Sequence, residues 1–578
     1  MAGLLTIITN RLQPAFDAVV PGADPVVRPS TRPGVDVQVN GALPLARRVG
    51  AAPAELAEKI VGTADLADVC SRVEVAPQGF VNLTLAAPWL AERVREQVGD
   101  PRLGRSAAAQ ARRVVVDYSA PNIAKELHVG ILRTTIIGDA LCRLLADAGH
   151  DVIRENHVGD WGTPFGMLIE HLVEEGEERT IQTLSVGDLK DFYQDARARF
   201  DASEEFRERS RARVVALQAG DPETLRLWRI LVDESVRYFS QLYARLGVLL
   251  QPEDVVGESF YNNQLASLVD ELDAKGLLVE SEGARCVFPP GFTNREGEPL
   301  PVIVQKSDGG YGYAATDLAA LRDRFGRLRA DLALYVVGAP QAQHFAMVFA
   351  VAHAAGWIPE GAEAVHIAFG NMLGPDRRMF RTRSGEAVAF TDLVDEAEQR
   401  GRDAVAEKSP GLPAGEQEVV AHAVGIGALK YADLSTDRLR DYVFDWDRML
   451  AFEGNTAPYL QYAHARIHSI FRRADLAPAT YRSGAVAPSV TEPAERELAI
   501  ALLGFDTAVE ATLESCSPHK LCAYLFELAG AFTTFYETCP VLRAEGNARD
   551  GRLVLCAATA AVLEAGLGLL GIDAPARM

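Results

Sequence analysis

A histidine and a glycine stand where a short apolar run gives way to a helical pattern, in VVVDYSAPNIAKELHVGILRTT (Val114 to Thr135). The run predicts a strand that ends near Tyr118, followed by a helix that begins near Gly130. The amino end of a helix favours anions, and a glycine there lets a nucleotide approach the backbone. His128 would then donate hydrogen bonds to phosphate oxygens. The stretch indicates a phosphate site, and the alternative is a loop histidine before a helix-starting glycine.

The elements around this stretch form one βαβ unit. The strand is followed by a helix over Ile131 to Ala148, closed by Gly149, and then by a strand in DVIRENHVG. This order predicts a parallel, Rossmann-like sheet in a domain over residues 109–385. The rest of the sheet is predicted in LPVIVQK and LALYVVG, and insertions that split the domain are predicted at about 170–235 and 262–299.

Two other regions flank this domain. Residues 1–108 combine a helical pattern in PAELAEKIV with a strand pattern in GFVNLTL, which predicts a small α+β domain. Residues 386–578 are almost wholly helical in period, which predicts a helical bundle. The expected fold class is therefore multidomain, with α/β, α+β and all-α parts.

Composition limits the classes of protein that this chain can represent. Its seven cysteines form no CxxC pair, and no apolar run approaches the ~20 residues of a membrane helix. The amino end has no basic leader followed by an apolar core. We therefore expect a cytoplasmic protein without a metal site or a membrane. The formal net charge of -21 does not exclude nucleic acid, because an acidic protein can present a basic groove.

The histidine stretch resembles the HIGH signature of class I aminoacyl-tRNA synthetases. The longer strings DYSAPNIAKELHVG, NHVGDWGTPFGML, VQKSDGGYGYAATDLAA and GNTAPYLQYAHARI resemble the arginyl-tRNA synthetases in particular. The resemblance implies ATP-dependent activation of L-arginine to an adenylate and its transfer to the 3′-terminal adenosine of tRNA-Arg. It also implies a Rossmann-like catalytic domain, an amino-terminal domain at the tRNA elbow, a carboxyl-terminal domain at the anticodon, and a monomer.

Residues that handle ATP follow from the same resemblance. Class I enzymes usually carry a second signature, KMSKS, and the matching loop here is GPDRRMFRTRSGEA, without lysine. The resemblance implies that Lys125, three residues before His128, supplies the missing cation beside the phosphates. Mg²⁺ would come with ATP rather than occupy a dedicated protein site. The expected catalytic residues are Lys125, His128 and Gly130, and the expected ATP-binding residues are His128, Gly130, Ile131, His344, Arg381 and Arg383.

Arginine recognition needs acceptors for a planar guanidinium that has five N–H donors. Tyr313 and Asp317 lie four residues apart and therefore on one face of a helix. The resemblance implies that both recognise the guanidinium, while by themselves they read as a packing aromatic and a solvated helix charge. The full expected set is Asp117, Ser119, Asn122, Tyr313, Asp317 and Gln341.

Ile131 stands where relatives with this context have the second signature histidine. Loss of one donor aimed at developing charge typically costs ~2.7–4 kcal/mol of transition-state stabilisation. The alternative hypothesis is therefore a diverged paralogue that binds tRNA without activation, or that serves a specialised biosynthetic or resistance role. The intact arginine set favours the ligase.

The tRNA contacts are expected in the two flanking domains. Val37 replaces a usual aromatic next to the elbow-binding positions, and a lost stacking platform could weaken that contact by ~1–3 kcal/mol. Tyrosine and arginine at helical spacing are otherwise typical of a core and its rim. The expected tRNA-binding residues are Gln38, Asn40, Tyr459, Gln461, Tyr462 and Arg466.

Overall fold

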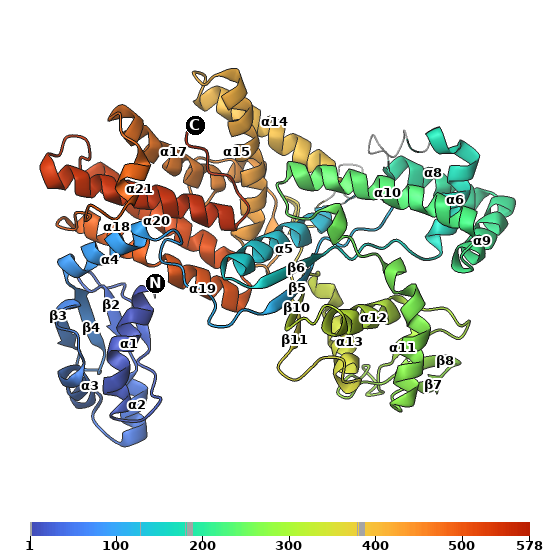
Figure 1. The fold of residues 1–578 in the computed structure, drawn as a ribbon, viewed down its shortest axis with the longest axis horizontal. Helices are drawn as coiled ribbons and strands as arrows, with labels where there is room; N and C mark the ends of the chain where they lie inside the picture. The colour runs from blue at the N-terminus through green and yellow to red at the C-terminus, as the bar shows by residue number, and fades with distance from the viewer. Residues whose placement is uncertain are drawn as a thin grey trace. The chain divides into compact units, whose positions relative to one another are not determined.

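The computed structural model describes residues 3–125, 127, 129–179, 181, 189–378, 380 and 388–578. The chain forms two compact units, both drawn in Figure 1. The first unit comprises Met1–Ala107, Gly401–Tyr431 and Asp447–Met578. The second comprises Ala108–Arg400 and Ala432–Trp446.

A four-stranded parallel sheet in the order β11-β10-β5-β6 forms the centre of the second unit. Val114, Val115 and Val116 are fully buried, as expected for a strand covered on both faces. The predicted Rossmann-like sheet is thus present. Its strands are β5 (Arg113–Asp117), β6 (Asp151–Glu155), β10 (Leu332–Tyr335) and β11 (Glu363–His366).

Helices cover both faces of this sheet. α5 (Val129–Asp147) connects β5 to β6, and α13 (Ala342–Ala354) connects β10 to β11 in the opposite direction across the sheet. Right-handed crossovers in opposite directions place helices on opposite faces. Figure 1 shows α5 on one side and α13 with α12 (Tyr313–Gly326) on the other. Gly138 brings α5 close to β5, because a Cβ there would overlap the Tyr118 side chain.

The elements between β6 and α12 run from α6 to β9, and one predicted strand of the parallel sheet lies in a different sheet. The segment LPVIVQK contains β9, which pairs with β8 in an antiparallel three-stranded sheet and not with the parallel sheet. The hairpin β7-β8 supplies the backbone partners that β9 needs, and an apolar run alone does not specify its partner. The inserted elements are α6 (Pro164–Glu175), α8 (Leu189–Ala202), α9 (Glu204–Gln218), α10 (Pro222–Arg245), η1 (Pro252–Asp254), η2 (Glu258–Tyr261), α11 (Asn262–Ala274), β7 (Val279–Ser281), β8 (Ala284–Val287) and β9 (Val302–Gln305).

A segment after the predicted domain boundary at residue 385 returns to the second unit. Ala432–Trp446 follows α15 (Ala414–Leu434), and its strand β13 (Tyr442–Val443) pairs with β12 (Met372–Leu373). Helical periodicity gave no sign of this return, because a two-residue strand has no detectable pattern. The other elements here are η3 (Ala339–Gln341), α14 (Phe390–Lys408) and α16 (Trp446–Met449).

A buried ion pair fastens the returning segment to α5. Arg133 and Asp433 are each 1% exposed, and Arg133 Nε lies 2.9 Å from Asp433 Oδ2. The guanidinium also lies over the rings of Phe369 and Tyr442. Burial raises the pKa of the Asp433 carboxyl, and the Arg133 charge opposes that rise.

Asp433→Ala is expected to lower the free energy of unfolding by ~3–5 kcal/mol, because it leaves the Arg133 charge buried and uncompensated. The matched control is Asp151→Ala, which removes an exposed partner 2.7 Å from Arg113 and should cost less than ~1 kcal/mol. Urea unfolding followed by fluorescence measures both changes. Equal, small losses in the two variants would show that the buried pair does not stabilise this unit.

The amino-terminal part of the first unit is the predicted α+β domain. Its antiparallel sheet has the order β1-β2-β4-β3, and helices pack against it through residues such as Ile8, Phe16 and Ile60. The elements are α1 (Leu4–Asp17), β1 (Val27–Pro29), β2 (Val37–Val39), α2 (Ala42–Val49), α3 (Pro53–Thr63), β3 (Cys70–Val75), β4 (Val81–Leu85) and α4 (Ala87–Gly99).

The carboxyl-terminal part of the same unit is a helical bundle. Among the described residues, α21 alone is long and apolar enough to cross a membrane, with a mean hydropathy of 1.6 over 18 residues. The expectation that no run approaches that length was therefore wrong for α21. Because 78% of that window is buried, α21 is the core helix of the bundle. The bundle contains α17 (Ala457–Arg473), η4 (Pro478–Arg482), α18 (Pro493–Leu503), α19 (Phe505–Ser515), α20 (His519–Thr538) and α21 (Gly546–Leu569).

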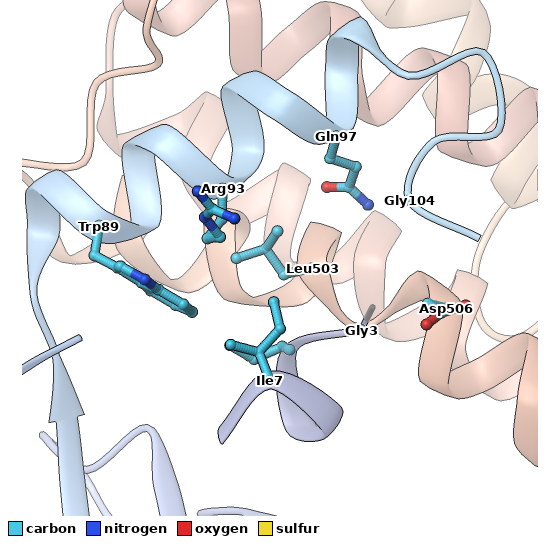
Figure 2. Close-up of a pocket in the computed structure, with 9 residues that line it drawn as sticks. Gly3, Ile7, Trp89, Arg93, Gln97, Gly104, Leu503 and Asp506 are labelled. Carbon is cyan, nitrogen blue, oxygen red and sulfur yellow. The ribbon is translucent and has the colours of Figure 1, made fainter. Parts of the chain in front are cut away.

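Helix α4 joins the amino-terminal domain to this bundle. Gln97 Nε2 donates to Leu502 O at 2.8 Å, and Arg496 of α18 forms an ion pair with Asp36. Figure 2 shows a small pocket at this junction, where Trp89, Arg93 and Gln97 of α4 point toward α1 and α18. The amino-terminal domain and the bundle therefore pack as one unit.

Candidate functional site

The loop between β5 and α5 has an unusual backbone. Ser119, Ala120 and Ala124 all have positive φ, at 72°, 49° and 54°, a region that residues other than glycine seldom adopt. A side chain from a different element accepts a hydrogen bond from the amide of each one. The three bonds are Ser119 N to Thr134 Oγ1 at 3.1 Å, Ala120 N to Asn156 Oδ1 at 2.9 Å, and Ala124 N to Ser235 Oγ at 3.0 Å. These three residues are therefore held in their strained conformations by side chains of the protein.

Two of the predicted ATP residues, Gly130 and Ile131, lie at the start of α5. Gly130 is exposed and Ile131 is half-buried in the first turn, at the carboxyl end of β5. The Nζ of Lys125 lies 5.0 Å from the ring centroid of Tyr193 on α8. His128, Arg381 and Arg383 lie outside the described residues. The helix end and the exposed glycine fit a nucleotide phosphate.

Ser119 and Asn122 have different environments. The Ser119 hydroxyl is buried, 2.7 Å from the hydroxyl of Tyr243, and accepts a hydrogen bond from Thr135 Oγ1 at 2.9 Å. This corrects the expectation that Ser119 touches the substrate, because its side chain is enclosed. Asn122 is exposed, and its backbone forms a bridge with Gly159.

Helices α12 and α13 bring three predicted residues together. Asp317 Oδ2 accepts a hydrogen bond from His344 Nε2 at 2.6 Å, and the Tyr313 ring centroid lies 4.8 Å from that of His344. Tyr313 is 68% exposed, and Gln341 is exposed in η3, just before α13. The Tyr313 phenol is thus presented to solvent beside a fixed carboxylate, as guanidinium recognition requires.

Two carboxylates that sequence analysis missed lie near Asp317. Burial raises the pKa of Glu258 to about 7, and the charges of Asp160 and Asp317 add to this rise. Burial also raises the pKa of Asp160, whose carboxylate accepts hydrogen bonds from Ser259 N and Oγ. Gly257 is required here, because a Cβ would overlap the Asp160 carboxylate. The Glu258 carboxyl thus lies within the electrostatic influence of two other carboxylates, and a cation close to it would favour its charged form.

No periodic signal in the sequence marked these two residues. Asp160 stands in NHVGDWG, which carries part of the family resemblance, and Glu258 begins a four-residue helix between the two predicted insertions. They lie far from Asp317 in sequence, and only the fold brings them near it.

The Asp117 carboxylate forms an ion pair with a guanidinium of the protein. Its Oδ2 accepts a hydrogen bond from Arg324 Nη2 at 2.8 Å, and Arg324 Nε donates to Glu155 Oε2 at 2.6 Å. Asp117 is also buried. Its Oδ1 is buried without a hydrogen-bond partner within the described residues, so its expected role as a second carboxylate for the substrate stays a prediction.

Comparisons with known proteins cover the whole chain. The family model "tRNA synthetases class I (R), catalytic domain" matches residues 94–446, the "Arginyl tRNA synthetase N terminal domain" matches 3–85, and the "DALR anticodon binding domain" matches 460–578. Two curated relatives are the arginine–tRNA ligases of Thermobifida fusca, 51% identical over 100% of both chains, and Frankia casuarinae, 50% identical over 100% of this chain and 99% of the relative. The chain belongs to the class I arginyl-tRNA synthetases.

Solved arginyl-tRNA synthetases have the same fold over their full length. The structure from Plasmodium falciparum gives a TM-score of 0.86 at 28% identity, and that from Thermus thermophilus gives 0.82 at 26% identity. Both comparisons cover 100% of each chain. The predicted three-part architecture and family are thereby confirmed.

In this synthetase, the predicted anticodon residues divide into buried and exposed ones. Gln461 is fully buried, and its Nε2 donates to Ala423 O and Asp573 O. Its expected contact with tRNA is therefore corrected to a structural role in the bundle. Tyr459 is half-buried beside Phe526.

Tyr462 and Arg466 form a surface group with a third residue that sequence analysis missed. The Arg466 guanidinium lies 4.9 Å from the Tyr462 ring centroid and 5.6 Å from that of Tyr536 on α20. Tyr462 is 40% exposed. Aromatic and guanidinium planes of this kind can stack on nucleobases. The sequence gave no signal for Tyr536, because it lies on another helix.

The predicted elbow residues of the synthetase lie in β2 (Gln38) and directly after it (Asn40). Gln38 is half-buried, and its Nε2 donates to Asn82 Oδ1 at 3.0 Å. Asn40 is half-buried, and its Oδ1 has no hydrogen-bond partner within the described part of the chain. Val37 is fully buried on the opposite face of the strand. The suggestion that Val37 replaces a stacking platform is therefore wrong, because this side chain faces the domain core.

Proposed function

We propose that this chain is an arginine–tRNA ligase that activates L-arginine with ATP and transfers it to tRNA-Arg. The arginine carboxylate attacks the α-phosphate of ATP, pyrophosphate leaves, and the 3′-terminal ribose hydroxyl of tRNA then displaces AMP from the adenylate. The observation that carries the proposal is the Asp317 carboxylate, which is held by His344 beside the exposed phenol of Tyr313. No observation favours the alternative of a paralogue without activation.

Asp317 and Glu258 would contribute to arginine recognition in different ways. Asp317 is held by His344, so its carboxylate is oriented before arginine arrives. Burial, together with the charges of its neighbours, raises the pKa of Glu258, and a bound guanidinium would favour its charged form. A substrate without a positive side chain would leave these carboxylates repelling one another, so the group selects for arginine.

The nucleotide is placed by the loop between β5 and α5 and by the start of α5. Gly130 exposes backbone at the positive end of the helix, and Lys125 stands on the same loop. We assign His128, His344, Arg381 and Arg383 to the ATP side from the family pattern. Mg²⁺ bound with ATP would neutralise charge on the phosphates. Each of these residues stabilises or orients phosphate oxygens as charge shifts to the leaving pyrophosphate.

Outside the catalytic unit, Tyr459, Tyr462, Arg466 and Tyr536 are proposed to contact the anticodon, and Gln38 and Asn40 the tRNA elbow. We also propose that the enzyme works as a monomer in the cytoplasm without a membrane. Aminoacylation of tRNA-Arg with labelled arginine tests the proposal. Charging that depends on ATP and arginine is expected, whereas tRNA binding without charging would leave only a tRNA-binding paralogue.

Arginine affinity is expected to increase as pH rises through about 7. The pKa of the Glu258 carboxyl is raised to about 7, so below that pH the group is mainly protonated and offers no charge to the guanidinium. The raised pKa also affects folding. Between the pKa of Glu258 in the unfolded chain and about 7, the folded state binds more protons, so the contribution of Glu258 to the free energy of unfolding falls as pH increases.

The KM for arginine between pH 6 and 8 measures this effect. It should fall as pH rises in the wild type. In Glu258→Gln it should be higher and nearly independent of pH, whereas the KM for ATP serves as the internal control. A Glu258→Gln variant that keeps the wild-type pH profile would assign the titration to another group.

A further inference from the structure

Arg324 lies beneath the ends of three strands. It stands in the last turn of α12 and is only 1% exposed. Besides its bonds to Asp117 and Glu155, its guanidinium lies 4.6 Å from the ring centroid of Tyr335. Tyr335, Asp117 and Glu155 are the last residues of β10, β5 and β6 and are paired in register. One guanidinium therefore contacts three neighbouring strand ends at once.

The same helix presents the arginine-binding carboxylate. Asp317 precedes Arg324 by seven residues, which places both on nearly the same face of α12. The position of Arg324 under the sheet thus sets the rotation of α12 and the direction of Asp317. Tyr335 also packs against Phe345 and Phe349 of α13, the helix that carries His344.

The cluster also reaches the helix of the third carboxylate. Tyr261 ends η2, three residues after Glu258, and its fully buried ring lies within the electrostatic influence of Arg324. Within the described residues, Tyr261 Oη and Asp117 Oδ1 are buried without a hydrogen-bond partner. The cluster is thus packed against both elements that carry the arginine-binding acids.

The chemistry of the cluster repeats that of the substrate pocket. Here two carboxylates and a tyrosine ring contact a guanidinium that belongs to the protein, whereas Asp317, Glu258 and Tyr313 are proposed to receive the guanidinium of the substrate. Without Arg324, Asp117 and Glu155 would be an unpaired buried carboxylate pair, which strongly attracts a cation. With Arg324 in place, one of the two negative charges is neutralised and both carboxylates are held in fixed positions.

We propose that Arg324 is a positioning residue for arginine recognition. It aligns Asp317 and Glu258 for a single guanidinium. This inference rests on the proposed function, because it concerns the same pocket.

The test uses Arg324→Lys, Arg324→Ala and the control Arg322→Gln in the full chain. Arg322 lies on the same helix but pairs with Glu271 and stacks on Trp357, away from the strand ends. Calorimetric titration with L-arginine and arginine-dependent ATP–pyrophosphate exchange are measured for each. Arg324→Lys should weaken arginine binding and raise the KM for arginine about 10- to 100-fold, with the KM for ATP unchanged, because small misplacements cost this much. Arg322→Gln should resemble the wild type.

Chemical rescue separates positioning from a general loss of structure. Millimolar guanidinium should restore arginine binding to Arg324→Ala by filling the vacated site, whereas in the wild type it should only compete. If Arg324→Ala does not fold, the ratio of the KM for arginine to the KM for ATP in Arg324→Lys still tests the inference. A folded Arg324→Lys with unchanged arginine affinity, or with KM values for arginine and ATP raised alike, overturns the inference. A wild type that binds arginine without exchange overturns the ligase proposal while the binding comparison still tests Arg324.

Discussion

Asp317→Asn should reduce kcat/KM for arginine by roughly 30- to 5000-fold, the equivalent of the ~2–5 kcal/mol lost when one member of a buried charge pair is removed. Asparagine keeps the shape and can still accept the hydrogen bond from His344, so the loss isolates the negative charge. Steady-state exchange with arginine varied at saturating ATP measures it. The KM for ATP should not change.

The control for Asp317→Asn is Asp308→Asn. Asp308 is an exposed carboxylate in the turn before α12, where it accepts a hydrogen bond from Gly310 N. Its replacement changes net charge by the same amount near the same helix. If both variants keep the wild-type KM for arginine, the carboxylate group of Asp160, Glu258 and Asp317 is not where the guanidinium binds.

Ile131→His should increase the rate of exchange at saturating substrates by up to ~100-fold. Ile131 is half-buried in the first turn of α5, so an imidazole can replace it without leaving a large core cavity. A donor aimed at the developing phosphate charge is worth ~2.7–4 kcal/mol in comparable sites. Rapid-quench or exchange kinetics with tRNA present measure the gain.

Ile131→Phe is the matched control, because phenylalanine supplies a ring of similar size without a hydrogen-bond donor. It should not exceed the wild-type rate. Equal rates in the histidine and phenylalanine variants would mean that this position does not reach the phosphates in the transition state, and that Ile131 costs the enzyme nothing.

Local patterns predicted the parts of the site that lie on regular elements. The apolar run before Tyr118 predicted β5, and the helical pattern after it predicted α5. The spacing of Tyr313 and Asp317 predicted that both lie on one face of α12. Each of these depends on residues close together in the chain, and the resemblance supplied their chemical roles.

The features that sequence patterns predicted wrongly or missed depend on contacts between segments far apart in the chain. An apolar run cannot show which sheet receives β9, and helical periodicity cannot show that Gln461 is held by two backbone carbonyls. Ser119 and Asp117 stand at the expected strand end, yet Tyr243 and Arg324 enclose them from elements far along the chain. Glu258 lies in a short 3-10 helix, and such a helix leaves no periodic pattern in the sequence.

Arginine-dependent ATP–pyrophosphate exchange, with and without tRNA-Arg, tests the central claim most directly. The account predicts exchange that requires arginine and ATP and that increases when tRNA is bound. An absence of exchange under every condition, in both the wild type and Ile131→His while tRNA still binds, would contradict it.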